Sequence, residues 1–423
     1  MKLQKILNRL QKLHPKKIDL SLNRIKNLCK KLKNPQKNIK SISVVGTNGK
    51  NSTIQTIRSI LIAAGIKCNA YISPHIQKIN ERFIYNNKEV EDEELYKILS
   101  EVEEINNGEK ITYFEILTAA FFLGAKKFKD NINIIESGLF HRFDATNIID
   151  ANLASIITPI GIDHTDWLPK NEKTIDKIIF EKTSSLLKSK IIVSKQYDEE
   201  TQKKIKKSLK SNSSKKIFFN DLYSFSLKEN NFFYYEDEYG GLKLPMPNLI
   251  GEFQITNVAT AIATLRNIDE LKISQNQIKE GITNIQSIAR LQEIKFGKLK
   301  SIVKNNKLFV DGSHNPLGAK VLTDYLDTIH YNKHLIVGMM LNKEHQEYIN
   351  FFKNKINSIT TVDIPNQPNS IKGKDLKNKI NGFDKIKYKS SIQEALKSLK
   401  LDEGDIILIT GSLYLAGEVL NLN

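Results

Sequence analysis

Cysteine and tryptophan are scarce in this chain of 423 residues, which contains two cysteines and one tryptophan. The two cysteines, Cys29 and Cys68, cannot form a disulfide framework, and their spacing matches no metal-binding motif. This scarcity favours a reducing compartment, so we expect a cytoplasmic protein. No run of eighteen apolar residues occurs, and we therefore expect no membrane span and no membrane partner. The lysine-rich residues 1–17 lack a continuous apolar core, which is typical of an amphipathic helix rather than a secretion signal.

Acidic side chains are fewer than basic ones, and the 47 Asp and Glu residues against 64 Lys and Arg residues give a net charge of +17. A basic balance can indicate nucleic acid, a membrane surface or anionic substrates as partners. The alternative is a general overuse of Lys, Asn and Ile, of the kind that an AT-rich genome causes. Because the lysines are scattered and no arginine-rich or aromatic-interleaved patch occurs, we expect no nucleic-acid partner.

Strand and helix patterns alternate along the first half of the chain. The segment "SISVVG" (41–46) is a short β-branched run, and apolar residues at helical spacing follow from Lys50 to a terminating Gly65. Alternation of buried strands with helices predicts a mostly parallel, doubly wound sheet. Further strands are predicted at 67–73, 131–137, 153–159 and 190–195, and helices at 112–128 and near 171–188.

The pattern changes after Asp198. Residues 199–215 are crowded with Lys, Ser and Asn, which indicates a solvated helix or a linker, and aromatic-rich strands follow. Helical spacing returns at 254–285, and a second α/β series then begins, with strands at 307–312, 334–340 and 405–411. We place the boundary near Ser287, which predicts domains 1–287 and 288–423.

The segment "GTNGKNST" (46–53) lies between a predicted strand and a predicted helix. Backbone N–H groups at a helix N-terminus, with glycines that permit close approach, form a phosphate-binding site. Lys50 supplies a positive charge there, and Ser52 supplies a hydroxyl that could contact Mg²⁺. The spacing differs from the general phosphate-loop pattern, since Gly46 and Gly49 are only three residues apart and Asn51 separates Lys50 from Ser52. An ordinary glycine-containing turn before a helix is the other interpretation.

Three polar residues follow other predicted elements of the first half. Glu136 ends a buried strand, where it is either a metal ligand beside a nucleotide or a carboxylate paired with a cation. His164 lies in "GIDHTDW" (161–167), after the next strand, where a second component of a site would lie. Lys182 lies on a helix, and by its context alone it is a surface lysine.

Two segments of the second half are further candidates. "DGSHNPLGA" (311–319) follows a strand, so Asp311 and His314 either contact a ligand or belong to a turn in which Asn-Pro starts a helix. Arg290, at the proposed boundary, either reaches a phosphate or is a solvated charge.

Taken in order, the segments resemble the folylpolyglutamate synthase and dihydrofolate synthase family, part of the Mur ligase superfamily of ATP-dependent amide ligases. The resemblance covers nearly the whole chain, and many segments matching in order are far more specific than one loop. The matching segments are "LHPKKIDLSLNRIKNL", "GTNGKNST", "YISPHI" with "NER", "TYFEILTAAFF", "IIESGLFHRFDATN", "GIDHTDWL", "FEKTSSLL", "GEFQITNVATAIA", "ARLQEI", "DGSHNP", "GMMLNKEH" and "ITGSLYLAGEV".

The resemblance implies a fold and a set of roles. The fold is an N-terminal P-loop ATPase domain with the doubly wound sheet, followed by a smaller Rossmann-like α/β domain. The implied contacts to ATP are Gly49, Lys50, Asn51, Ser52, Asn257, Arg290, Asp311 and His314. The implied ligands of two Mg²⁺ ions are Ser73 and Glu136 for the first, His164 for the second, and Lys182 as a carbamate. Of these residues, Lys50, His164 and Lys182 are the expected catalytic ones.

The implied reaction is ATP-dependent ligation of L-glutamate to dihydropteroate, and also to folyl-glutamates such as reduced folates, through an acyl phosphate. We expect a monomeric enzyme with both activities, because "LHPKKIDLSLNR" resembles the bacterial members that make dihydrofolate. The alternatives are a single-activity folate ligase, a ligase of cell-wall precursors, or a non-catalytic nucleotide-binding or nucleic-acid-binding protein.

The chain also departs from the family pattern. Asn51 stands where the family usually has glycine, and Phe253 stands where it usually has histidine. Phe140 and His141 replace a usual glycine pair. Because glycines permit close backbone approach or positive φ, we expect the bulky pair to re-shape the loop beside the metal sites or the pterin pocket.

Overall fold

The computed structural model describes residues 2–14, 19–228, 231–384 and 386–423. It divides into two compact units, and each takes in more than one stretch of the chain. The first unit is Met1–Gly161, Pro169–Asn248 and Ile255–Gln286, and the second is Ile162–Leu168, Leu249–Gln254 and Ser287–Asn423. Two short segments from the first two-thirds of the chain therefore belong to the second unit. The segment "LHPKKIDLSLNRIKNL", which begins at Leu13 and resembles the family, includes residues 15–18, and these lie outside the described residues.

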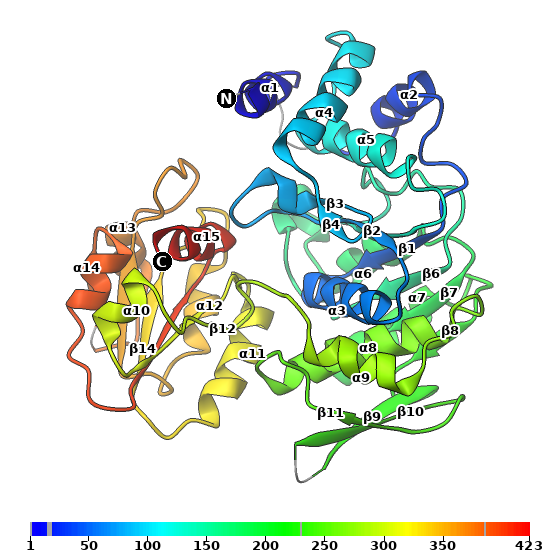
Figure 1. The fold of residues 1–423 in the computed structure, drawn as a ribbon. Helices are drawn as coiled ribbons and strands as arrows, with labels where there is room; N and C mark the ends of the chain where they lie inside the picture. The colour runs from blue at the N-terminus through cyan, green and yellow to red at the C-terminus, as the bar shows by residue number, and fades with distance from the viewer. Residues whose placement is uncertain (1, 15–18, 229–230, 385) are drawn as a thin grey trace. The chain divides into compact units, whose positions relative to one another are not determined.

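An eight-stranded sheet is the centre of the first unit (Figure 1), with the strand order β4-β3-β2-β5-β1-β6-β7-β8. Six neighbouring strands pair in parallel, in the spatial order β2, β5, β1, β6, β7 and β8. The strands β3 and β4 extend the sheet beyond β2 as an antiparallel edge. The strands are β1 Ser41–Val45, β2 Cys68–Tyr71, β3 Phe83–Tyr85, β4 Lys88–Glu89, β5 Ile132–Glu136, β6 Ala154–Ile157, β7 Lys190–Val193 and β8 Lys216–Phe218. The prediction of a mostly parallel, doubly wound sheet is confirmed.

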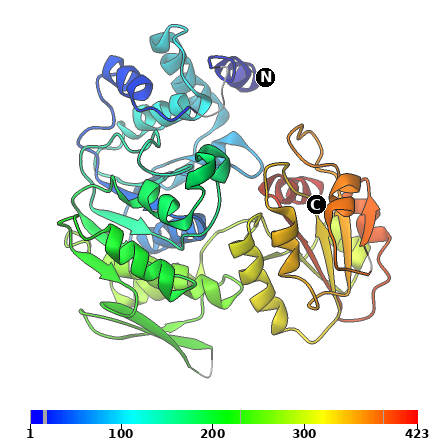
Figure 2. The same cartoon turned by 180° about the vertical axis from the view of Figure 1, so that it is seen from behind.

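Helices cover both faces of this sheet. The helix α3 (Lys50–Ala63) lies with α9 (Gln275–Thr283) on one face in Figure 1, and Figure 2 shows α6 (Ile175–Thr183) and α7 (Glu199–Ser208) on the other. A Cβ at Gly281 would lie 2.5 Å from the Cα of Ile60, so only glycine permits this close approach of α9 to α3. The remaining helices of the unit are α1 Lys2–Leu10, α2 Asn23–Lys31, α4 Asp92–Asn106, α5 Tyr113–Ala125 and the Ile255–Arg266 part of α8 (Glu252–Arg266).

Capping residues in the sequence account for several helix boundaries. Thr112 accepts a hydrogen bond from the backbone N–H of Glu115, whose carboxylate accepts one from the Thr112 N–H, and this capping box starts α5. The helix predicted near 171–188 is shorter, because Thr174 caps α6 and the chain before it forms a 3₁₀ turn. Ser274 caps α9, and this cap divides the helical pattern at 254–285 into two helices.

A three-stranded antiparallel sheet, in the order β11-β10-β9, accounts for the aromatic-rich segment of the first unit. Its strands are β9 Tyr223–Lys228, β10 Phe232–Asp237 and β11 Leu242–Pro245. Phe233 and Tyr235 alternate with exposed residues along β10 and are buried, so one face of this sheet packs inward.

The second unit contains a six-stranded sheet in the order β12-β13-β17-β14-β15-β16, parallel except for β12. This arrangement confirms the predicted smaller Rossmann-like fold. The strands are β12 Gln292–Glu293, β13 Lys307–Val310, β14 Lys333–Val337, β15 Ser358–Val362, β16 Ile386–Lys389 and β17 Ile406–Thr410. The helices are α10 Lys298–Val303, α11 Pro316–Asp327, α12 His345–Asn350, α13 Gly373–Lys379, α14 Ile392–Lys397 and α15 Leu413–Leu422. Among the described residues, none of the helices has the length and apolarity that crossing a membrane requires.

Candidate active site

The loop 46–49 joins the carboxyl end of β1 to the N-terminus of α3. Its backbone is anchored to the end of β6, because the N–H groups of Thr47 and Asn48 donate to the carbonyl oxygen of Pro159 at 2.9 and 3.2 Å. The carboxyl ends of parallel strands are where open α/β sheets bind ligands, and the first N–H groups of α3 have no partner within the helix. The loop therefore has the position and the donors of an anion site.

Both glycines of this loop have backbone conformations that other residues rarely adopt, with φ +148° at Gly46 and +83° at Gly49. A Cβ at Gly46 would lie 2.0 Å from Oγ1 of Thr158, and one at Gly49 would lie 2.5 Å from Oδ1 of Asn257. Asn257, on α8, is buried against the phosphate loop within the first unit. The structure thus explains why glycine is required at two positions and places a predicted nucleotide contact at the loop.

Two lysines converge on the same loop from different helices. Nζ of Lys50 lies 3.3 Å from the carbonyl oxygen of Gly46 and 3.1 Å from that of Thr47. Nζ of Lys182, on α6, donates to the carbonyl oxygens of Gly46 and Leu139 at 2.8 and 2.9 Å. Lys182 is only 2% exposed, so its interpretation as a surface lysine is wrong. Lys182 is buried because the end of α6 lies at the loops that follow β1 and β5. Helix periodicity in the sequence does not reveal this contact.

Glu136, the last residue of β5, is buried beside this loop. Its Oε2 accepts a hydrogen bond from the backbone N–H of Ser73 at 3.0 Å, and its Oε1 lies 3.9 Å from Nζ of Lys50. A carboxylate and a neighbouring serine hydroxyl are oxygen donors that suit Mg²⁺, which commonly takes its other ligands from phosphates and water. The two residues therefore fit a shared magnesium site with a nucleotide. No group of three His, Cys, Asp or Glu side chains suited to a metal occurs in the part of the chain that the structure describes.

The substituted pair Phe140 and His141 is buried in the loop after β5. The Phe140 ring lies 5.6 Å from Nζ of Lys182, at cation–π distance. Nδ1 of His141 lies 3.0 Å from Oγ of Ser137, and burial together with the charge of Lys182 lowers the pKa of His141 to about 4. The backbone N–H groups of His141 and Arg142 both donate to the Glu181 carbonyl oxygen at 3.0 Å, which fastens the loop to α6.

In the second unit, the turn after β13 is organised by Asp311. This buried carboxylate accepts hydrogen bonds from the backbone N–H groups of Leu291 (2.7 Å) and Ser313 (2.8 Å). Burial raises the pKa of Asp311, and the charge of Arg290 opposes that rise. Arg290 is partly buried and donates to the carbonyl oxygen of its neighbour Ala289 at 3.0 Å. The interpretation of Arg290 as a freely solvated charge is therefore not supported.

His164 also belongs to the second unit, together with His314. Both imidazoles face one carboxylate, that of Asp163, with Nε2 to Oδ2 distances of 3.9 Å for His164 and 3.4 Å for His314. Two histidines that the sequence places 150 residues apart therefore lie around a common residue.

Comparisons with known proteins place this geometry in a family. The Mur ligase, glutamate ligase domain family matches residues 298–413. The dihydrofolate synthase/folylpolyglutamate synthase of Buchnera aphidicola subsp. Acyrthosiphon pisum is 30% identical over 420 residues, which cover 98% of this chain and 97% of that protein. This chain belongs to the dihydrofolate synthase/folylpolyglutamate synthase family. It is therefore an ATP-dependent ligase.

Other members of the dihydrofolate synthase/folylpolyglutamate synthase family agree over the same length. The Escherichia coli K12 protein of that name is 27% identical over 419 residues, covering 98% of this chain and 94% of that protein. A structure of E. coli FolC in complex with DHPP and ADP has a TM-score of 0.85 at 27% identity and covers 99% of this chain and 97% of that one. A Yersinia pestis bifunctional enzyme complexed with AMPPNP and Mn ion has a TM-score of 0.86 at 26% identity, with the same coverage.

Within this family fold, the predicted site residues form two groups, one in each unit. The group around the phosphate loop contains Gly49, Lys50, Asn51, Ser52, Ser73, Glu136, Lys182 and Asn257, and the group in the second unit contains His164, Arg290, Asp311 and His314. Asn51 and Ser52 lie in the first turn of α3. Their roles toward ATP and metal stay predictions, as do the two domains 1–287 and 288–423.

Several residues around this ligase site had not been assigned roles from the sequence. Thr158 packs on Gly46, Glu181 pairs with Arg142 through two hydrogen bonds of 2.9 and 2.7 Å, and Lys343 contacts Asp163. Each partner lies far along the chain from the motif that it supports, so no local spacing could have identified it.

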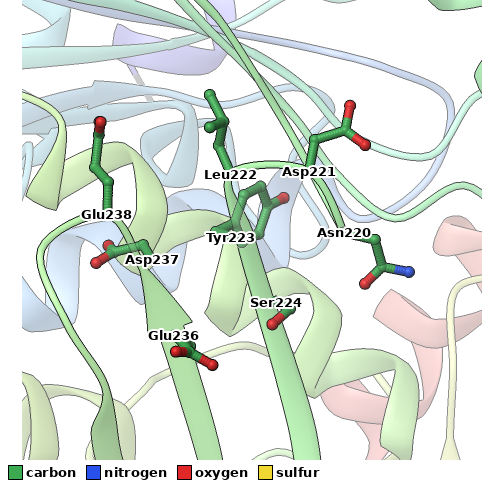
Figure 3. A pocket seen from close by; sticks show the side chains of 8 residues that line it. All are labelled: Asn220, Asp221, Leu222, Tyr223, Ser224, Glu236, Asp237 and Glu238. Carbon is green, nitrogen blue, oxygen red and sulfur yellow. The ribbon is translucent and has the colours of Figure 1, made fainter.

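A cavity of about 260 Å³ lies apart from the phosphate loop, between β9 and β10, lined by residues 220–224 and 236–238 (Figure 3). Three of its four carboxylates, those of Asp221, Asp237 and Glu238, have cationic partners. Asp237 forms two hydrogen bonds with Arg266, at 2.8 and 2.9 Å, and Asp221 pairs with Lys206 at 2.6 Å. The cavity is therefore a surface depression with paired charges rather than the site of the chemistry.

Proposed function

We propose that this enzyme joins L-glutamate to dihydropteroate and also to folyl-glutamates, using ATP and a divalent metal ion. The observation that carries this proposal is the phosphate loop 46–49, on which Lys50, Lys182 and Asn257 converge from three helices. A chain-length match to enzymes named for both synthase activities supports the choice of acceptors. Structures of relatives described with DHPP, with AMPPNP and Mn ion, and with L-glutamate support the choice of ligands.

In the first step, a carboxylate oxygen of the folate acceptor attacks the γ-phosphorus of ATP, and ADP leaves. Lys50 and the N–H groups at the start of α3 neutralise charge on the phosphates as the bond to ADP breaks. A metal ion held by Ser73 and Glu136 would supply further neutralisation of phosphate charge. The product is an acyl phosphate, in which the former carboxylate carbon is open to attack.

In the second step, the neutral amine of L-glutamate attacks that carbon. The tetrahedral intermediate loses a proton and expels inorganic phosphate, which leaves an amide. No covalent bond to the enzyme is needed, so the contribution of the chain is positioning and electrostatic stabilisation.

The finer assignments belong to the same proposal. A second Mg²⁺ would take His164, and Lys182 would be carbamylated, with Asn257, Arg290, Asp311 and His314 contacting the nucleotide. The buried Nζ of Lys182 ends at the loop, which fits a group that acts there. A carbamate nitrogen keeps one N–H, so only one of the hydrogen bonds to Gly46 and Leu139 could remain after modification. We also propose that the enzyme acts as a cytoplasmic monomer.

The test is ADP release measured with each acceptor. We expect release that requires both L-glutamate and either dihydropteroate or tetrahydrofolate, and mass spectrometry of the product should show one added glutamyl residue. Activity with only one of the two acceptors would show that the enzyme is a single-activity folate ligase. Release of ADP with a UDP-muramyl substrate, but with neither folate, would show a cell-wall ligase instead.

A further inference from the structure

Asp163 is a carboxylate on which donors from three parts of the second unit converge. It lies in the segment Ile162–Leu168, which the chain contributes to this unit from the first half of the sequence. Oδ1 accepts hydrogen bonds from the backbone N–H of His164 and from Nζ of Lys343, both at 2.8 Å. Oδ2 accepts one from Nδ2 of Asn315 at 3.1 Å and lies 3.4 Å from Nε2 of His314.

The carboxylate of Asp163 is buried next to the largely buried ammonium of Lys343. The Asp163 side chain is 8% exposed, and that of Lys343 is 12% exposed. A buried ionised carboxylate is stable only when it is paired and hydrogen-bonded, so these contacts depend on one another.

The hydrogen bonds of Asp163 hold the His164 segment and the N-terminus of α11. His164 has φ +59°, a left-handed conformation that is unfavourable for a non-glycine residue, and its backbone N–H donates a hydrogen bond to Asp163. Asn315 caps α11 by accepting from the Gly318 N–H at 2.8 Å while its amide donates to Asp163. One carboxylate therefore joins the His164 segment to the start of α11, where His314 lies.

We propose that Asp163 is a positioning residue for the ligase reaction, which holds His164 and His314 in one rigid group, with Lys343 as its counter-charge. The proposal rests on the proposed function for the roles of the two histidines. Asp163 contacts neither the metal nor the nucleotide in this account, and it acts only through its neighbours. A merely structural salt bridge is the competing explanation, and it predicts a loss of stability without a specific loss of metal-nucleotide binding.

The first test is Asp163→Asn, which keeps the size of the side chain but removes its charge and turns N–H groups toward Lys343. Supporting side chains of a metal site typically contribute about 10- to 100-fold in metal affinity or activity, and we expect a loss in that range. Calorimetry should show weaker binding of ADP with Mn²⁺, and a smaller loss for ADP with EDTA, where only the contact of His314 with the nucleotide is disturbed. With ATP and L-glutamate saturating and the folate varied, kcat should fall by a larger factor than the KM for the folate rises.

The matched control is Asp324→Asn, the same substitution at an exposed residue of α11 in the same unit. It should leave calorimetry, kinetics and thermal unfolding unchanged. Wild-type affinity for ADP with Mn²⁺ in Asp163→Asn would overturn the proposal, and so would an activity loss that only follows the unfolded fraction.

A second variant decides the matter if Asp163→Asn does not fold. Lys343→Met leaves the carboxylate in place without its counter-charge, and it should also weaken binding of ADP with Mn²⁺. Where Asp163→Asn does fold, the two losses should be less than additive in the double variant, because both changes disturb one contact. Fully additive losses would overturn the pairing. If the wild-type chain released no ADP with any folate acceptor, the proposed function would fail, whereas the calorimetry would still decide the role of Asp163.

Discussion

Nζ of Lys182 lies 2.8 Å from the carbonyl oxygen of Gly46, although the two residues are 136 positions apart in the chain. The contact brings the end of α6 to the loop after β1, on the side where the parallel strands end. A buried ammonium at that place is costly unless it has partners, and two carbonyl oxygens supply them. The position of Lys182 is therefore defined by two loops, the phosphate loop and the loop after β5 that contains Leu139.

The first prediction concerns the carbamate on Lys182. A neutral amine and CO₂ form a carbamate with release of a proton, which would convert a cation beside the loop into an anion able to help bind Mg²⁺. We expect the wild-type enzyme to lose activity in CO₂-depleted buffer and to regain it with bicarbonate. Labelling with ¹³C-bicarbonate should give one carbamate signal by NMR.

Lys182→Ala is the matching variant. It should be insensitive to bicarbonate and at least 10-fold less active, with partial rescue, at most, by short carboxylates, in line with the effect of supporting groups at metal sites. Wild-type activity in this variant would rule out the carbamate proposal. A carbamate signal of unchanged intensity in Lys182→Ala would place the modification elsewhere.

The second prediction concerns Lys50, whose Nζ contacts carbonyl oxygens of its own loop and lies 3.9 Å from Glu136. We expect Lys50→Met to lower kcat by about 10²-fold or more, because removal of one group that stabilises transition-state charge typically has this effect. The measurement is steady-state ADP release at saturating ATP. The control is Lys67→Met, at an exposed position of the same unit, where activity should not change. Wild-type kcat in Lys50→Met would show that Lys50 has no catalytic role.

The regular part of the fold follows from local patterns in the sequence. The β-branched run at 41–45 and the apolar spacing after Lys50 each predict one element, and the structure contains both. Short edge strands such as β12 and β16 were not predicted, since two to four residues with mixed burial give no periodic signal.

The site was predictable only where its residues lie next to a recognisable loop. Lys50 and Ser52 could be assigned from the strand–loop–helix context, whereas Lys182 and Asn257 needed the family resemblance. Their contacts with Gly46 and Gly49 arise from packing of distant helices, which one sequence does not encode as a local pattern. The partners of Asp163 could not be identified at all for the same reason.

The third prediction concerns Asn51, which replaces a usual glycine of the family. Asn51 lies in the first turn of α3 and has a helical backbone conformation, so a residue other than glycine fits this position without strain. We expect Asn51→Gly to keep the affinity for ATP within several-fold, because the backbone N–H stays in place. Stability should fall by no more than about 1 kcal/mol, the usual cost of glycine in a helix. Calorimetry with an ATP analogue checks the affinity, and a complete loss of binding would show a role for the asparagine side chain.

The fourth prediction concerns Phe140, which is 2% exposed and lies 5.6 Å from the ammonium of Lys182. Phe140→Ala should reduce the free energy of unfolding by about 3–5 kcal/mol, because it leaves a cavity where a buried aromatic side chain was. Phe140→Leu keeps most of the apolar volume, so its cost should be below about 1.5 kcal/mol. Urea unfolding measures both.

The two substitutions also separate packing from an influence on Lys182. Phe140→Leu removes the aromatic ring and with it the cation–π contact to Lys182, while it leaves the loop packed. We therefore expect it to change kcat and the bicarbonate dependence more than it changes stability. Phe296→Leu, at a residue that is 81% exposed, is the control and should alter neither property. If Phe140→Leu had wild-type kinetics, the ring would be a packing group alone, and its contact with Lys182 would have no part in the reaction.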